Sequence, residues 1–188
     1  VALTFKHPRR PRGTVGSFRE NLKVGLFQAM LNQRLDGLSR NADAPFLRAF
    51  AYDSGLGRTV DTFNMSATTT DGGQAAGLKG LVREMERVRR YGFLPSELER
   101  AKTDLMSTYE SAWREKDKSE SADFAVQYVS NFLDEEPIPS IDWEYQAARQ
   151  LVAGITLDEV AALTKMFIHD DNRVILAQSP EKEGVTPP

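Results

Sequence analysis

The stretch TVDTFNMSATTTDGGQAAGLKGLVREMERVRRYG, residues 59–92, changes its hydrophobic period half-way along. Apolar and polar residues alternate from Thr59 to about Thr70, which is typical of a half-buried strand. Asp71-Gly72-Gly73 predicts a turn, and beyond it apolar residues return every three or four positions, as on one face of a helix. Gly92 stands where that helix should end. The stretch therefore predicts a strand that turns directly into an amphipathic helix.

The residues before this stretch predict two more strands and a long helix. Apolar residues alternate from Val1 to Phe5, which indicates a first strand. Residues 14–38 carry apolar side chains at helical spacing, and Ser17 with Glu20 matches a capping box just inside the start of that helix. Phe46 to Tyr52 predicts a further strand, which we expect to pair antiparallel with the strand of the opening stretch.

The residues after this stretch predict several helices and one last strand. Pro95 suits the first turn of a helix, and Thr156 with Glu159 matches a capping box. The acidic, proline-containing segment 134–139 interrupts the helical pattern. The expected elements are a helix from Pro95, helical structure beyond Lys118 to about Leu133, helices over 141–153 and 156–167, and a strand over 173–178.

Length and the order of the elements predict one α+β domain. The chain has 188 residues, of which 40% are hydrophobic and 27% charged, and this suits a single compact core. Strands and helices do not alternate one by one. We therefore expect a mostly antiparallel sheet with helices packed on one face, which is a two-layer sandwich. This domain should span residues 1–180, followed by a loose tail at 181–188.

Charge and composition exclude several classes of partner and site. The 24 Lys and Arg against 27 Asp and Glu give a net charge of -3, which provides no field to attract nucleic acid or an anionic membrane. There is no apolar run long enough to span a bilayer and no Cys, so disulfides and thiolate metal sites are excluded. The lack of Cys does not identify the compartment. Because the chain starts with Val1 and a strand begins at once, we expect a segment of a longer protein.

The residues alone identify no catalytic, cofactor-binding or metal-binding group. The two histidines, His7 and His169, stand at opposite ends, whereas a zinc hydrolase needs three protein ligands around an open position. The two histidines could meet if the first and last strands were neighbours, but a lone surface or strand-end histidine is the simpler interpretation. Acidic residues at 134–136 and 170–171 are typical of a solvated surface, and Asp71-Gly72-Gly73 lacks the Gly-Lys-Ser/Thr of a phosphate loop.

Three further segments stand in a characteristic order: LFQAMLNQRL at 26–35, EMERVRRYGFLPSELERAK at 84–102 and ITLDEV at 155–160. In this order they resemble the non-catalytic domain repeat of the insulinase/pitrilysin zinc metallopeptidases, and the likeness covers roughly residues 1–180. The resemblance implies a sheet-and-helix domain, copies of which enclose a chamber for unfolded peptides. The zinc of that family lies in another copy, on an inverted His-x-x-Glu-His motif that this sequence lacks.

The resemblance also implies partners and a place for the cofactor. Zinc is expected in a catalytic domain of the parent protein, upstream of Val1, and the partners would be sister domains of the same chain and extended peptide. Some repeats of the family supply an Arg and a Tyr about seven residues apart to hold the substrate. Arg40 falls near the Arg position, but Leu47 stands seven residues later and the first Tyr is Tyr52. We therefore expect that this copy does not complete the active site.

Three hypotheses follow. The first is a non-catalytic, chamber-forming and substrate-enclosing domain of a zinc endopeptidase; if its sheet leaves an edge open to peptide, the strand at Thr59 to Thr70 is the candidate. The second is an assembly scaffold within a homologue that has lost its zinc motif. The third is a free-standing α+β domain that binds a ligand, which would require a closed apolar pocket.

Overall fold

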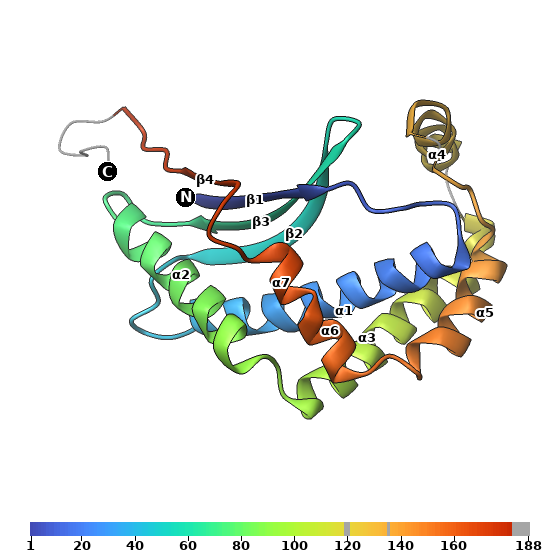
Figure 1. Ribbon diagram of the computed structural model, residues 1–188, viewed down its shortest axis with the longest axis horizontal. Helices are drawn as coiled ribbons and strands as arrows, with labels where there is room; N and C mark the ends of the chain where they lie inside the picture. The colour runs from blue at the N-terminus through green and yellow to red at the C-terminus, as the bar shows by residue number, and fades with distance from the viewer. Residues whose placement is uncertain (119–120, 135, 182–188) are drawn as a thin grey trace. The chain divides into compact units, whose positions relative to one another are not determined.

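A computed structural model describes residues 1–118, 121–134 and 136–181 (Figure 1). The elements are, in order, β1 (Ala2–Pro8), α1 (Val15–Ser39), β2 (Arg48–Leu56), β3 (Val60–Thr68), α2 (Gln74–Tyr91), α3 (Pro95–Arg114), the 3-10 turn η1 (Lys116–Lys118), α4 (Ser121–Asp134), α5 (Ile141–Val152), α6 (Leu157–Ala162), α7 (Thr164–Phe167) and β4 (Arg173–Leu176). They form two compact units. The sheet unit comprises residues 1–9, 27–93 and 161–181, and the helical unit comprises residues 10–26 and 94–160.

The sheet unit contains a four-stranded antiparallel sheet in the order β2-β3-β1-β4. The pairing of β2 with β3 was expected from the sequence and is confirmed. The expectation that the strand at Thr59 to Thr70 forms an open edge is wrong, because β3 pairs with β2 on one side and with β1 on the other. Sequence alternation shows which face of a strand is buried, but not which strands lie beside it. The edges of the sheet are β2 and β4.

Helices cover one face of this sheet, as the sequence predicts. The C-terminal half of α1, together with α2 and α7, lies under the sheet in Figure 1. The core between the layers is a cluster of phenylalanines: the rings of Phe63 and Phe167 stack at 4.6 Å between centroids, and Phe27 meets both edge-on. Each of these side chains is fully buried, which stabilises the fold by roughly 1.5–3 kcal/mol per side chain.

Glycines allow α2 to approach the connection before β2 closely. A Cβ atom on Gly80 would lie 2.6 Å from Pro45, and one on Gly77 would lie 2.4 Å from Thr69. Gly92 ends α2 with a φ of 62° and donates its N–H to the carbonyl of Val88, which confirms the expected end of this helix.

The helical unit is built from the N-terminal half of α1, α3, α4, α5 and most of α6. Phe18 of α1 packs edge-on against Trp143 of α5 at 5.0 Å and against Tyr109 of α3 at 6.3 Å between ring centroids. The guanidinium of Arg19 donates to both carboxylate oxygens of Glu159, at 2.7 and 3.0 Å. These contacts join helices that are distant in the sequence.

The helix boundaries follow the expected caps, with two exceptions. Thr156 and Glu159 form the predicted capping box by reciprocal hydrogen bonds. At the start of α1, however, Thr14 and Ser17 form the reciprocal pair, so the expected box of Ser17 with Glu20 is wrong. The helix starts at Val15, so Thr14 is the residue just before it, and the hydroxyl of Thr14 is therefore the one that reaches the free N–H groups.

The second exception concerns the helix expected over 156–167, which is two short helices, α6 and α7, separated at Leu163. The fold class is confirmed as α+β, with an antiparallel sheet and helices on one face. The single domain over 1–180 stays a prediction. The expected loose tail at 181–188 lies outside the described residues, apart from Glu181. No described helix combines the length and the hydrophobicity that a membrane span requires.

Candidate functional site

His7 of β1 is buried in the sheet unit, where it contacts β2 on the far side of β3. Its Nε2 lies 3.2 Å from Oδ1 of Asp53 on β2, and its Nδ1 lies 3.1 Å from the carbonyl oxygen of Pro8. Burial alone lowers the pKa of the imidazole, but these two hydrogen bonds and the charges of Asp53 and Asp61 outweigh it, so the pKa of His7 is raised above 6.5. The ring also packs against Phe167. His7 is thus part of a buried ion pair that joins β1 to β2.

His169 follows α7 and packs by its ring against Phe5, at 5.6 Å between centroids. Its Nδ1 lies 3.1 Å from Oδ1 of Asp171. The strands β1 and β4 are neighbours, which is the arrangement that could bring the two histidines together. Each histidine nevertheless has its own carboxylate partner, Asp53 for His7 and Asp171 for His169. Among residues 1–118, 121–134 and 136–181 there is no cluster of three or more histidines and acids that could hold a metal ion.

The acidic and glycine-rich segments singled out in the sequence occupy surface positions. Asp170 and Asp171 have side chains that are 80% and 82% exposed, and Asp170 lies near Arg89 and Arg173. Glu136 pairs with Arg12 at 3.5 Å, while Glu135 lies outside the described residues. The segment 71–73 forms the expected turn, in which Gly72 has a φ of 76°.

Arg40 and Tyr52 have different contacts in the structure. Arg40 follows the end of α1, is largely exposed and pairs with Asp36 one helical turn back. Tyr52 lies on β2, where its ring stacks on Phe50 at 5.5 Å, and both rings are exposed. Leu47 is exposed immediately before β2. No interaction joins Arg40 to Tyr52 among the described residues, and the arrangement assigns neither of them a shared role.

The uncovered face of the sheet carries a polar network between its strands. Thr4 of β1 donates to Oδ1 of Asn64 on β3 at 2.8 Å, and the amide nitrogen of Asn64 donates to the hydroxyls of Ser54 and Thr62. Ser54 and Thr62 are also joined, at 3.0 Å. These hydroxyls and amides are satisfied by one another, so they stabilise the strand pairing and leave no reactive group.

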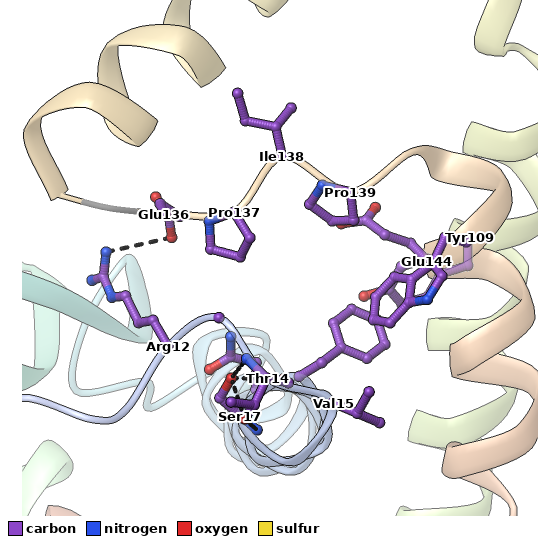
Figure 2. A pocket seen from close by; sticks show the side chains of 14 residues that line it. Arg12, Thr14, Val15, Ser17, Tyr109, Glu136, Pro137, Ile138, Pro139 and Glu144 are labelled. Carbon is purple, nitrogen blue, oxygen red and sulfur yellow. Dashed lines mark hydrogen bonds and ion pairs between the residues drawn. The ribbon is translucent and has the colours of Figure 1, made fainter.

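The helical unit contains a cavity of about 500 Å³, whose wall comes from four segments (Figure 2). One wall is the start of α1, with Val15 and Phe18, and another is the segment 136–139, which includes Pro137 and Pro139. The remaining walls are Tyr109 of α3 and the pair Trp143 and Glu144 of α5. Its lining combines aromatic and apolar side chains with polar ones from Thr14, Ser17 and Asn21 and with three charged groups, and a mixture of apolar walls and a few polar groups is typical of ligand sites.

Burial changes the ionisation of two groups that line this cavity. Desolvation raises the pKa of Glu144 above its ordinary value, since the half-buried carboxylate is poorly hydrated. Desolvation, with the nearby charge of Glu144, raises the pKa of Tyr109 to about 12, so its phenol stays neutral at physiological pH. Within the part of the chain that the structure describes, the carboxylate of Glu144 has neither a hydrogen bond nor an ion pair.

Sequence reasoning did not find this cavity. Phe18, Tyr109 and Trp143 each fall within a helix that the sequence predicts, and nothing in their local spacing marks them as lining a cavity; Glu144 looks like one more acid on the polar face of α5. The four groups that form the wall come from positions up to about 130 residues apart in the sequence, and no local spacing relates them. Only the packing of α1, α3 and α5 brings them together.

Comparison with known proteins adds a family likeness. No protein-family model matches the chain. A zinc protease of the PQQL-like type from Arabidopsis thaliana is 26% identical over 181 residues, which is 96% of this chain and 16% of that protein. The periplasmic protease PqqL from Escherichia coli has 17% identity and a TM-score of 0.83, over 92% of this chain and 19% of that chain.

An insulinase-family protease from Yersinia pestis has 12% identity and a TM-score of 0.73, over 87% of this chain and 36% of that chain. The resemblance found in the sequence is thus confirmed by a curated relative and by the fold of solved structures. The chain spans less than a fifth of the length of the Arabidopsis thaliana protein and less than a fifth of the length of the Escherichia coli protease.

Proposed function

Because the chain resembles one domain of the insulinase-type zinc peptidases in sequence and in fold, we propose that it is a non-catalytic, chamber-forming and substrate-enclosing domain of a larger zinc endopeptidase. The observation that carries the proposal is the match of 96% of this chain to 16% of a zinc protease, in a sequence without the inverted zinc motif. Zinc would lie in another domain of the parent protein, and the work of this chain would be to shape the space around the peptide.

Exposed apolar side chains support a domain that is covered by other parts of a larger protein. The described side chains of α4 include none that is buried, and its large apolar ones are exposed: Phe124, Val126, Tyr128, Val129, Phe132 and Leu133. Phe132 alone is 86% exposed. A contiguous apolar surface of this kind is typical of a face that contacts another protein surface. In the proposed parent, sister domains would cover α4.

The edges of the sheet bear on how an extended peptide could be held. Strand edges present unpaired N–H and C=O groups to which a peptide can add as a further strand. At β2 the side chain of Asn32 already occupies part of the edge, because it bonds both the N–H and the carbonyl of Ala51. At β4 all four residues are exposed. We therefore place any strand-like contact with peptide at β4 rather than at β3.

A comparison of two purified proteins tests the proposal: the parent protein with its natural flanking sequence, and the 188-residue chain alone. Zinc content by mass spectrometry and cleavage of a quenched fluorescent peptide would be measured for both. We expect the parent to hold zinc and to cleave the peptide, with activity lost on adding a chelator. The 188-residue chain should neither bind zinc stoichiometrically nor cleave.

The matched control replaces both histidines of this chain within the parent, as His7→Gln and His169→Gln. Zinc content should be unchanged in this double variant. Tight zinc binding by the 188-residue chain that disappears with either substitution would contradict the proposal. A parent without an inverted zinc motif, inactive towards peptide, would instead identify the chain as an assembly domain of an inactive homologue.

A further inference from the structure

The titratable side chains that line the cavity of the helical unit indicate which charge a ligand should carry. These side chains are Arg12, Tyr109, Glu136 and Glu144. Arg12 and Glu136 neutralise each other at the rim through an ion pair of 3.5 Å, and the dashed line in Figure 2 marks it. Tyr109 is neutral. What remains is the negative charge of Glu144, half-buried and without a partner among the described residues.

An unpaired carboxylate in a poorly hydrated place is unfavourable, and a cation placed beside it would remove that cost. The neighbouring surfaces suit an organic cation better than a hydrated metal ion. Phe18, Tyr109 and Trp143 provide aromatic rings, whose faces attract ammonium groups. Pro137, Ile138 and Pro139 add apolar surface that fits a chain of methylene groups. The second carboxylate of the lining, Glu136, is paired with Arg12, and no group of three or more histidines and acids among the described residues could hold a metal ion.

We propose that this cavity is a binding site for an alkylammonium group, as carried by the lysine side chain of a peptide, with Glu144 as the counter-charge and the three aromatic rings as the walls. The site belongs to the helical unit alone. It does not depend on whether the parent protein is a peptidase, so the two proposals succeed or fail separately.

Trp143 lines the cavity and can report on binding directly. The chain has two tryptophans, and Trp113→Phe leaves Trp143 as the only indole while keeping a ring beside Tyr145. The 188-residue chain with this substitution would be titrated with Nα-acetyl-lysine methylamide. The neutral counterpart is Nα-acetyl-norleucine methylamide, which has a similar stem and no charge. We expect saturable changes in Trp143 emission and in the NMR shifts of the lining residues with the lysine compound, and at least tenfold weaker binding of the norleucine compound.

Glu144→Gln keeps the size of the side chain and removes its charge, and it should weaken binding of the lysine compound about tenfold. Glu115→Gln, on an exposed acid that follows α3 and does not line the cavity, is the control and should change the affinity less than twofold. Circular dichroism would show that both variants are folded.

The pH dependence gives a measurement that needs no variant. A cation stabilises the ionised form of Glu144, so affinity should be full above the raised pKa of this group and should fall as the pH drops through it. The proposal is overturned if the norleucine compound binds as tightly as the lysine compound, if Glu144→Gln binds as wild type does, or if the lysine compound does not bind at concentrations that saturate weak sites.

Discussion

At the scale of single residues, His7 shows how a side chain that looks catalytic can be structural. It is one of only two histidines, but its ring nitrogens are held by Asp53 and by the carbonyl of Pro8, and it is 4% exposed. The ion pair of His7 with Asp53 links β1 to β2 across β3, and it exists as a charged pair only while the imidazole is protonated.

This predicts a dependence of stability on pH that His7 alone produces. The pKa of His7 is raised in the folded state, so its contribution is fully present below about 6.5 and is lost as the pH rises through the folded-state value. The free energy of unfolding in urea, measured between pH 5.5 and 9, should fall over this window in the wild type. The fall should persist in His169→Gln and disappear in His7→Gln; an equal fall in all three proteins would contradict the assignment.

Asn32 is the second residue whose role only the structure shows. Its amide oxygen accepts from the N–H of Ala51 at 2.6 Å, and its amide nitrogen donates to the carbonyl of Ala51 at 2.9 Å. The side chain thus substitutes for a neighbouring strand at the edge of β2. Removing it would leave both backbone groups without these partners.

We therefore expect Asn32→Ala to lower the free energy of unfolding by about 1–3 kcal/mol, since two partly buried backbone groups lose their hydrogen bonds. Asn41→Ala, at an exposed position in the turn after α1, is the matched control and should change it by less than about 0.5 kcal/mol. The measurement is the urea midpoint at constant slope. Equal midpoints for the two variants would show that Asn32 does not hold the edge of β2.

At the scale of elements, α1 is joined to the start of α6 by one charged pair. The guanidinium of Arg19 binds both oxygens of Glu159, and Glu159 also accepts from the N–H of Thr156 as part of the capping box. The hydrogen bond from Arg19, with that from Thr156, lowers the pKa of Glu159 to about 2. One carboxylate therefore caps a helix and ties it to another.

Because this pKa is depressed, the stabilisation from Glu159 is present above about 4.5 and is lost as the pH falls towards 2. Arg19→Met should lower the free energy of unfolding at pH 7 by about 1 kcal/mol, because both side chains are about one third exposed, and should flatten the fall in stability between pH 4.5 and 2. Arg40→Met, in an exposed pair, serves as control and should keep that fall. The measurement is thermal unfolding between pH 4.5 and 2. If the Arg19→Met protein loses stability over this range as much as the wild type does, the prediction is wrong.

At the scale of the whole molecule, each of the two units has a buried apolar core and also exposes large apolar side chains. The phenylalanine cluster under the sheet is fully buried, whereas α4 exposes six large apolar side chains. The exposed apolar side chains of α4 are the physical basis for proposing a domain of a larger protein, since exposing an apolar helix face to water is unfavourable unless another surface covers it. The proposed zinc chemistry belongs to the parent; the contribution that we propose for this chain is the shape of the chamber and a binding site for a cationic group.

Periodicity and capping residues predict most of the elements and several of their ends, because both are local properties of the chain. The turn at 71–73, Gly92 at the end of α2, Pro95 in the first turn of α3 and the Thr156–Glu159 box all agree with the structure. The family resemblance came from the same local segments. Packing between distant residues accounts for the rest: β3 is central, Asn32 occupies part of the edge of β2, and Glu144 lines the same cavity as aromatic residues of α1, α3 and α5. Strand order and cavities arise from packing between segments far apart in the chain, and no local pattern encodes them.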